Sequence, residues 1–531
     1  MRTPLFLRRP RALLALSLAC ALVAAPLGAQ PPAAPPGLNA YVEQVRGTFA
    51  VPGIALAIVK DGQVVLTQGY GVREKDKPTP VDEHTLFGIA SNSKAVTATA
   101  LGMLVEEGKL AWDARVVDYL PWFQLADPYV TRELTVRDLL VHRSGLALGA
   151  GDLLWWPPTT YSREEVVRRL RHLPLATSFR GTYAYDNVLY IAAGQLVEAV
   201  SGQTWEEFVA ARILRPVGMT ESHVRHPGAA APNLATPHAS VEGVVRPVAP
   251  FASDNANPAA GIHSNARDVA RWMIVQLDSG RVGDTAHLFA PATARQLWTL
   301  VTPQPIGTPA PELAALRPSF RGYALGFEVR DYRGQKLVTH TGGLPGYVSR
   351  VMLVPDLKLG VAVLTNQEAG AAFDALAYRV LDHYLGAPAT DWAAAYRRTR
   401  LRTDSSVAAA ERETAAARRR GTRPSLPLAA YAATYTDPWY GEVPVALENG
   451  RLVLRFAATP ALVGDLEHWQ HDTFVVRWRD RELRADAFLS FALNADGRVE
   501  QATMRAVSPA TDFSFDFHDL RLRPAPRPPT R

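Results

Sequence analysis

The chain has 531 residues, of which 47% are hydrophobic and 20% charged, and its formal net charge is +6. This length suggests two or three domains, and the composition excludes disordered and fibrous proteins. The excess positive charge lies near the N-terminus, in 397–420 and in the last residues, and no nucleic-acid-binding motif accompanies it, so we expect no nucleic-acid partner.

The first residues have the composition of a secretory signal peptide. Four arginines precede the apolar stretch "ALLALSLACALVAAPLGA", which ends in small residues and is followed by "QPPAAPPG". This order predicts a signal peptide over residues 1–29 and an exported bacterial protein, periplasmic or secreted, with no stable membrane span after cleavage. A retained anchor and lipidation of Cys20 are the alternatives. Because Cys20 is the only cysteine, the mature chain is expected to have no disulfide and no thiol chemistry.

Residues 38–388 are expected to form an α+β domain. It opens with a helical pattern in "YVEQVRGTFAVPG" and continues with two strand patterns that meet at Asp61-Gly62, a hairpin signal. The pattern over residues 91–280 is mostly helical. One helix start is marked by a capping box, Ser162 with Glu165.

Strand patterns return over residues 321–367, and a helical run follows at 370–385. Strands at both ends of this region imply that its termini meet in one sheet. We therefore predict an antiparallel sheet flanked by helices, with an inserted helical lobe.

The remaining sequence predicts a linker and a second domain. Residues 389–427 are rich in alanine and arginine, which favours a helical linker that ends at Gly421. Short strand patterns over residues 428–523, separated by Asn-Gly and Asp-Gly turns, predict a small antiparallel β domain. The proline-rich residues 524–531 are typical of a disordered tail.

Ser91 and Lys94 are the first candidates for chemistry. Lysine is scarce, with seven residues against fifty arginines, yet Lys94 follows Ser91 by one helical turn in the apolar stretch "GIASNSKAV". We expect a helix that starts near Ser91 and ends at Gly108, so that both side chains share one face. A desolvated lysine loses its proton readily and can accept one from a serine hydroxyl, and a helix N-terminus stabilises developing negative charge. The alternative is a helix start whose lysine extends into solvent.

Tyr185 and Asn187 are the second pair of candidates. They flank Asp186 immediately before an apolar helical stretch. A phenol can relay a proton, and an amide can bond a substrate carbonyl. The alternative is an N-cap formed by Asp186 or Asn187, with Tyr185 packed in the core.

The third group of candidates ends the strand pattern in "KLVTHTGGLPGYVS". Small residues at a strand edge allow a substrate backbone to lie alongside, and the N–H of Gly343 could pair with that of Ser91 as an oxyanion hole. The alternative is a strand followed by a glycine turn. The residues of this group are His340, Thr341, Gly342 and Gly343.

Together, the motifs "SNSK", "YDN" and "HTG", in this order near residues 91, 185 and 340, resemble those of the serine β-lactamase and penicillin-binding-protein superfamily. The resemblance is closest to its class C, esterase and D-aminopeptidase branch, and it covers residues 38–388. It implies a β-lactamase/transpeptidase-like fold and a cofactor-free serine hydrolase. The 428–523 region is similar to an accessory domain of unknown function that is attached to some of these hydrolases.

The resemblance also implies a role for each candidate residue. Ser91 would be the acylated nucleophile, with Lys94 as its partner in proton transfer. Tyr185 would be the general base and the acid for the leaving group. The substrate would be bound by the amide of the second motif and by the strand edge, namely by Asn187, His340, Thr341, Gly342 and Gly343.

Two positions depart from the family pattern. His340 stands where the lactamases and transpeptidases usually have a lysine, and a neutral imidazole holds a substrate carboxylate less firmly than an ammonium does. Asp186 stands in the middle of the second motif, where the family more commonly has a serine. The His-Thr-Gly form is more typical of the esterase and peptidase relatives, so we expect an esterase or D-peptidase rather than a strong β-lactamase.

Three other features have weaker functional interpretations. Ser144 has a histidine nearby, but the chain has no G-x-S-x-G motif. His223 and His226 form a lone pair without further metal ligands, so we expect no metal. The Trp155-Trp156 pair either forms an apolar lip beside the substrate or packs against its own domain.

The sequence therefore predicts a hydrolase that works without metal or cofactor. It would cleave a small-molecule or short-peptide substrate, a short ester, a D-amino-acid peptide or a β-lactam, through an acyl-enzyme on Ser91. The oligomeric state stays open. The alternatives are a metallohydrolase and a catalytically weak binding or sensor protein that recognises peptidoglycan-like peptides through the same fold.

Overall fold

The computed structural model describes Met1 and residues 33–228 and 231–526. The described residues from Ala34 onward form one compact unit. The predicted signal peptide, apart from Met1, lies outside the described residues, and Cys20 lies outside with it. Over the described ranges, no helix has both the length and the apolar character that crossing a bilayer requires.

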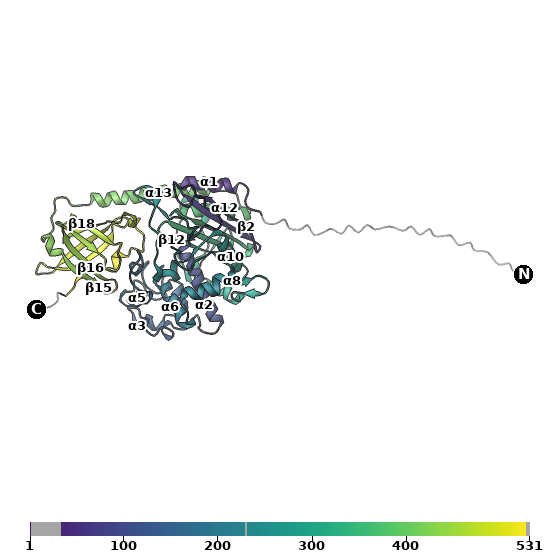
Figure 1. Ribbon diagram of the computed structural model, residues 1–531, viewed down its shortest axis with the longest axis horizontal. Helices are drawn as coiled ribbons and strands as arrows, with labels where there is room; N and C mark the ends of the chain where they lie inside the picture. Colours follow the sequence, from purple (N-terminus) through teal and green to yellow (C-terminus); the bar gives the residue numbers. More distant parts are fainter. Residues whose placement is uncertain (2–32, 229–230, 527–531) are drawn as a thin grey trace. The chain divides into compact units, whose positions relative to one another are not determined.

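Among the described residues, the first domain is built on an eight-stranded antiparallel sheet, in which the N-terminal hairpin pairs with strands from the end of the domain (Figure 1). The strand order is β2-β1-β14-β13-β12-β11-β10-β9, which confirms that both ends of the domain meet in one sheet. The strands are β1 Gly53–Lys60, β2 Gln63–Gly71, β9 Thr302–Pro303, β10 Arg321–Tyr323, β11 Glu328–Tyr332, β12 Gln335–Leu344, β13 Tyr347–Val354 and β14 Leu359–Thr365.

Helices cover both faces of this sheet (Figure 1). Helices α1, α12 and α13 pack on one face, and α10 and the helical lobe with α2 and α6 pack on the other. The main helices are α1 Leu38–Phe49, α2 Ser93–Glu106, α3 Pro128–Glu133, α4 Val136–Leu140, α5 Arg163–Arg169, α6 Val188–Ser201, α7 Trp205–Val209, α8 Arg215–Val217, α9 Asn257–Ala260, α10 Ala266–Leu277, α11 Pro291–Leu297, α12 Gly370–Tyr384 and α13 Trp392–Ala416.

Strand β1 shows how the sequence divides the core between these two layers. Its residues "GIALAIVK" are nearly all buried, as expected for a central strand with two covered faces. Ile54, Leu56 and Ile58 face the cluster that contains α1 and α12. Ala55 and Ala57 face the helical lobe, where the smaller side chains let α10 pack closely on the strand.

Helix α2 lies at the centre of the helical lobe. Every residue from Ser93 to Leu104 is buried, and the helix packs against α6, α9 and α11. A helix that is apolar all round is expected in such a position. The α-helix starts at Ser93 and ends at Glu106, and Ser91 lies in the preceding 3-10 turn of Ala90–Asn92. The sequence predicts a helix start near Ser91, but the α-helix starts at Ser93, because Ser91 belongs to the tighter 3-10 turn that precedes it.

The lobe also contains elements that fit the sequence pattern less simply. The capping box of Ser162 and Glu165 starts α5 as predicted. The mostly helical pattern over 91–280 is interrupted by the pair β4 His238–Val241 with β5 Val244–Pro247 and by β6 His263–Ser264, which pairs with β3 Phe87–Gly88. A further short pair, β7 Arg281–Val282 with β8 Ala286–His287, follows this range.

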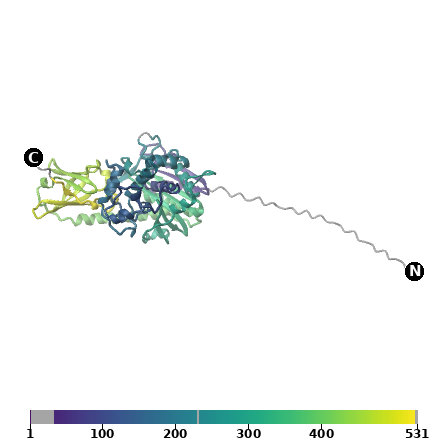
Figure 2. The same ribbon diagram turned by 90° about the horizontal axis from the view of Figure 1, so that it is seen from below.

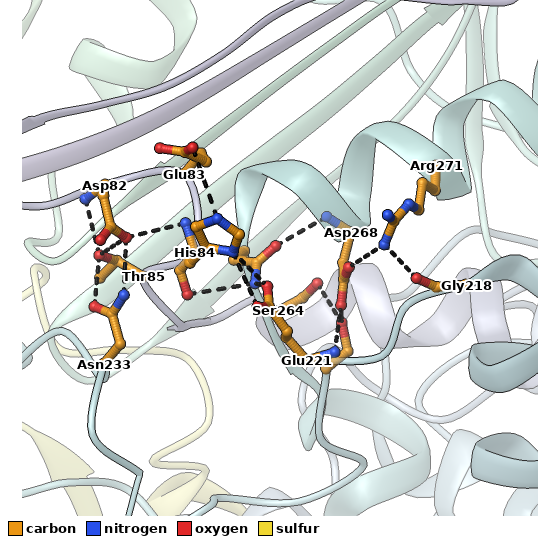
Figure 3. Close-up of polar contacts among 12 residues, drawn as sticks. Asp82, Glu83, His84, Thr85, Gly218, Glu221, Asn233, Ser264, Asp268 and Arg271 are labelled. Carbon is orange, nitrogen blue, oxygen red and sulfur yellow. Dashed lines mark hydrogen bonds and ion pairs between the residues drawn. The ribbon is translucent and has the colours of Figure 1, made fainter.

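A polar network, which we call the His84 cluster, ties the start of α10 to two loops (Figure 3). His84 Nδ1 lies 2.9 Å from the carboxylate of Glu221, and Asn265 donates to the same carboxylate at 2.7 Å. Asp268 accepts from the backbone N–H of Glu221 at 3.0 Å and pairs with Arg271 at 3.1 Å. The cluster consists of Asp82, His84, Thr85, Glu221, Ser222, Asn233, Ser264, Asn265, Asp268 and Arg271.

The described C-terminal region forms a second eight-stranded antiparallel sheet, which confirms the predicted β domain (Figure 2). Its strands follow one another in chain order, and the last one returns to pair with the first. They are β15 Ala433–Asp437, β16 Gly441–Glu448, β17 Arg451–Arg455, β18 Val463–Gln470, β19 Thr473–Trp478, β20 Ala487–Leu493, β21 Val499–Ala506 and β22 Arg523–Pro524.

Two details of this region correct the sequence prediction. Helix α13 ends at Ala416 rather than at Gly421, because the chain then turns so that Arg418 donates to the carbonyl of Trp469 at 2.8 Å. The predicted disordered tail starts too early, because Pro524 belongs to β22 and pairs with Tyr435. Residues 527–531 lie outside the described residues.

Candidate active site

Ser91 is held at the entrance of α2 by strands β12 and β13. The Ser349 hydroxyl donates to the carbonyl of Ile89 and accepts from the Asn92 amide, each at 2.8 Å. Strand β12 approaches this turn so closely that a Cβ on Gly342 would lie 2.1 Å from the Ile89 carbonyl oxygen. Gly342 therefore fits the site as a place of close backbone approach, which a larger residue would disrupt.

Lys94 lies one turn beyond Ser91, fully buried, and its Nζ bonds three acceptors. These are the hydroxyl of Ser91 at 3.0 Å, the side-chain carbonyl of Asn187 at 2.7 Å and the backbone carbonyl of Ala259 at 3.0 Å. All three acceptors are neutral. The predicted pairing of Ser91 with Lys94 is thus present in the structure, and the alternative of a solvent-exposed lysine is wrong.

Burial lowers the pKa of Lys94 to about 7, and the nearby carboxylates of Asp152 and Asp186 oppose this shift. A buried ammonium without an ionised hydrogen-bond partner is costly, so the neutral amine becomes accessible near neutral pH. The neutral amine keeps two N–H donors for Asn187 and Ala259, and its lone pair faces Ser91. Lys94 is therefore arranged to take the proton of the Ser91 hydroxyl.

Asn187 connects Lys94 to a buried acid that the sequence analysis missed. The Asn187 amide donates to Asp152 at 2.8 Å, and the indole of Trp155 donates to the other oxygen of the same carboxylate at 2.8 Å. Burial raises the pKa of Asp152 to about 7, while these hydrogen bonds oppose the rise. The signal that could have pointed to Asp152 was an acid in the apolar stretch "GDLLWW".

Asp186 is a second buried acid near Lys94. Burial raises its pKa to about 7, and the neighbouring charge of Asp152 adds to the rise. One of its oxygens accepts from the backbone N–H of Leu189 at 3.4 Å, within the first turn of α6. The side chain of Asn187 forms no cap, so the alternative of an N-cap is wrong for Asn187, whereas Asp186 does bond a backbone N–H in the first turn of α6.

Tyr185 lies over Lys94 and beside Ser91. The Nζ of Lys94 is 4.9 Å from the centre of the Tyr185 ring. Burial raises the pKa of Tyr185 well above its usual value, and a hydrogen bond with Ser91 opposes this rise. The phenol therefore keeps its proton at neutral pH, which suits a group that donates or relays a proton.

His340 stands on β12 opposite these groups as a neutral imidazole. Its Nδ1 bonds the carbonyl of Thr341 at 2.5 Å, so its Nε2 accepts from the hydroxyl of Tyr323 at 2.7 Å. Burial lowers the pKa of His340 to about 4, and the nearby Lys94 adds to this shift. The structure thus gives His340 no charge with which to hold a substrate carboxylate.

A cleft of about 440 Å³ opens at Ser91. Both Trp155 and Trp156 are buried and line it, so the tryptophan pair contributes to the cleft wall through its buried surface. Of the predicted site residues, the cleft is lined by Ser91, Tyr185, Asn187, His340, Thr341 and Gly343.

All eight predicted site residues therefore lie at one place, with Lys94 and Gly342 in the layer beneath the cleft. Ser91 and Gly343 both face the cleft, and the oxyanion hole formed by their N–H groups stays a prediction. We refer to Ser91, Lys94, Asp152, Tyr185 and Asn187 as the Lys94 site.

The other candidates, Ser144 and the pair of His223 and His226, do not line the cleft. Ser144 is buried and accepts from the backbone N–H of Leu146 at 3.1 Å, which fits a turn. The rings of His226 and His263 lie 5.0 Å apart. Within the part of the chain that the structure describes, no group of three or more His, Cys, Asp and Glu side chains is placed to hold a metal ion.

Known proteins resemble this chain over both domains. The sequence model of the Beta-lactamase family matches residues 38–385, and that of DUF3471, a domain of unknown function, matches residues 417–524. The unguisins hydrolase ungD of Aspergillus violaceofuscus is 30% identical over 433 residues, which cover 76% of this chain and 75% of that protein. Penicillin-binding protein 4 of Amycolatopsis lactamdurans is 28% identical over 348 residues, or 62% and 85% of the two chains.

A solved structure shows the same fold. The octameric penicillin-binding protein homologue from Pyrococcus abyssi superposes with a TM-score of 0.57, at 21% identity, over 91% of this chain and 98% of that chain. The predicted α+β fold with a second antiparallel β domain is thereby confirmed. On the family match over 38–385 and the likeness to penicillin-binding proteins and hydrolases, this chain belongs to the Beta-lactamase family.

Proposed function

We propose that this chain is an exported serine hydrolase that cleaves an ester or an amide through an acyl-enzyme on Ser91. The observation that carries the proposal is the buried amine of Lys94, which lies 3.0 Å from the Ser91 hydroxyl and has only neutral hydrogen-bond acceptors. Export rests on the sequence of residues 1–29 alone.

The proposed reaction has two stages. The Ser91 oxygen attacks the substrate carbonyl carbon while Lys94 takes its proton, and the carbonyl oxygen becomes an oxyanion that faces the N–H groups of Ser91 and Gly343. The bond to the leaving group then breaks as Tyr185 donates a proton to it and regains one from Lys94. Water attacks the resulting ester of Ser91 with the same proton acceptor, which releases the acid and restores the serine.

This division of roles refines what the resemblance implied. The resemblance assigned the general base to Tyr185, but the raised pKa of this partly buried phenol favours its protonated form at neutral pH, so that it suits the role of acid better than that of base. The lowered pKa of Lys94 favours the amine as base, with Tyr185 as the acid for the leaving group.

The proposed substrates are D-amino-acid peptides and short esters, because the His-Thr-Gly motif resembles that of the esterase and peptidase relatives. The neutral His340 gives a β-lactam carboxylate no ionic partner at this position, which supports weak rather than strong β-lactamase activity. The relative named an unguisins hydrolase supports hydrolysis in general.

Intact-mass spectrometry of the mature protein tests the proposal. A fluorophosphonate should add once to the wild type and not at all to the Ser91→Ala variant. A penicillin in a parallel sample would show whether the cleft accepts a β-lactam. A folded wild type that reacts with neither reagent would contradict the proposal and favour a binding or sensor protein.

A further inference from the structure

One segment of the C-terminal domain, Asp512–Asp516 with the sequence "DFSFD", packs against the first domain, residues 38–388, which we call the catalytic domain. Asp512, Phe513 and Ser514 line the same cleft as Ser91. The ring of Phe513 meets that of Tyr185 edge to face, with 6.1 Å between the ring centres. The C-terminal domain is thus part of the wall around the proposed nucleophile.

The hydroxyl of Ser514 bonds directly to the buried acid of the Lys94 site. It donates to Asp152 Oδ2 at 2.8 Å, and this oxygen also accepts the Asn187 amide at 2.8 Å. Asn187 in turn accepts from Lys94 at 2.7 Å. An unbroken chain of hydrogen bonds therefore runs from the C-terminal domain to the proposed general base.

Asp516 fixes the loop on both sides of Asp152. Its carboxyl accepts from the backbone N–H of Gly151 at 2.7 Å and from that of Leu153 at 3.1 Å. Asp516 is buried, and burial raises its pKa well above the usual value. The domain thus contributes a buried polar group whose hydrogen bonds hold the position of Asp152.

The catalytic domain is shaped to receive this segment. Gly149 has a positive φ of 71°, and a Cβ at this position would lie 2.7 Å from a ring carbon of Phe513. The backbone N–H of Gly149 donates to the carbonyl of Tyr185 at 2.9 Å. The loop at Gly149, against which Phe513 packs, therefore also holds the backbone of Tyr185.

We propose that the C-terminal domain completes the active site, and that Ser514 is a positioning residue for Lys94, acting through Asp152 and Asn187. This inference rests on the proposed function, in which Lys94 accepts the proton of Ser91. It gives a role in catalysis to the region that matches a domain of unknown function.

The titratable groups around Lys94 determine the direction in which its pKa should change in Ser514→Ala. Without the Ser514 hydroxyl, the Asp152 carboxylate loses a donor and its charged form becomes less stable, so it supports the ammonium of Lys94 less. The pH at which Lys94 becomes a base should therefore fall. The groups that face Lys94 or Asp152 are Ser91, Asp152, Asp186, Tyr185, Tyr190, His142, His340 and Asp516.

Of these groups, Asp152 and Asp186 titrate near neutral pH together with Lys94, whereas burial raises the pKa of Asp516 well above its usual value. Burial lowers the pKa of both His142 and His340, and burial raises the pKa of both Tyr185 and Tyr190. The histidines and tyrosines therefore stay neutral.

The test is the rate at which a fluorophosphonate acylates Ser91, measured against pH in the full mature chain. For Ser514→Ala we expect the midpoint of the rate to move by roughly 0.3–1 pH unit toward lower pH, with a limiting rate about 3–30-fold below the wild type. Ser514→Thr keeps the hydroxyl and should restore the midpoint. Ser490→Ala is the matched control, because it removes a hydroxyl that bonds Thr473 within the C-terminal sheet.

The outcomes separate this inference from the proposed function. A labelled wild type with an unshifted midpoint in Ser514→Ala would overturn the inference alone. An equal loss of rate in Ser514→Ala and Ser490→Ala, without any shift, would show a structural role only and would also overturn it. A wild type that is not labelled at Ser91 would overturn the proposed function and this inference together.

Discussion

The Lys94 site and the His84 cluster both join distant segments of the catalytic domain through acids and bases. In the His84 cluster two pairs of opposite charge bond each other: His84 lies 2.9 Å from Glu221, and Arg271 lies 3.1 Å from Asp268. The hydrogen bond that His84 donates to the Glu221 carboxylate raises the pKa of His84. Although burial acts the other way, His84 and Asn265 hold the pKa of Glu221 below its usual value.

The Lys94 site shows the opposite behaviour. Lys94 bonds only neutral acceptors, and burial lowers its pKa to about 7 while it raises those of Asp152 and Asp186 to about 7. In the His84 cluster the charged forms are stabilised, and in the Lys94 site they are not. This difference indicates that the first network supports the fold, whereas the second is prepared to move protons.

The largest effect should come from Lys94→Met. This change removes the proton acceptor but keeps an apolar side chain of similar length, so the chain should still fold. The rate of acylation by a fluorophosphonate should fall by about 10³-fold or more. Lys94→Arg should fall as far, because a guanidinium stays charged. Stopped-time mass spectrometry would measure both rates, and a variant that keeps a tenth of the rate would contradict the role of Lys94.

Asn187→Ala should have the next largest effect. It removes one acceptor from Lys94 and one donor from Asp152, so the amine loses its fixed position beside Ser91. We expect the acylation rate to fall by roughly 10–100-fold, with less effect on the melting temperature than on the rate. A rate equal to that of the wild type would show that Lys94 does not depend on this amide.

Glu221→Gln should show the smallest effect, and this effect should be on the stability of the fold rather than on the rate of acylation. The ion pair of His84 and Glu221 stabilises the fold most while His84 is protonated and Glu221 is ionised. Its contribution is lost as pH rises through the raised pKa of His84, above 6.5, and as pH falls through the lowered pKa of Glu221, below 4.5.

We therefore expect Glu221→Gln to lower the free energy of unfolding by about 0.5 kcal/mol between these limits, since the pair is partly exposed. Denaturant unfolding at pH 5.5 and 8.5 would measure the loss, which should be larger at pH 5.5. The midpoint of acylation against pH should stay where it is in the wild type. A shifted midpoint would mean that the two networks are coupled.

The sequence was sufficient to predict the parts of the site that lie close together in the chain. Ser91 and Lys94 are three residues apart at a helix start, and Tyr185 and Asn187 precede one helix, so local geometry brings each pair together. The two ends of the first sheet could also be predicted, because strand patterns occur on both sides of the helical lobe.

The contacts that tune Lys94 could not be predicted in the same way. Ser514 and Asp152 are 362 residues apart and belong to different domains. Nothing in the periodicity of "DFSFD" distinguishes a docking segment from an exposed turn of the second sheet. The pKa of Lys94 also depends on burial from several elements at once, which only the packed structure reveals.

The most direct test of Lys94 as the proton acceptor is a measurement of its own pKa. The chain has only seven lysines, so NMR of the protein labelled with ¹³C at the lysine Cε atoms should resolve a small set of signals across a pH titration. We expect one signal that titrates near pH 7 and is absent from Lys94→Arg. If every lysine signal titrated near pH 10, the ordinary value for lysine, Lys94 would be charged at neutral pH and could not be the base.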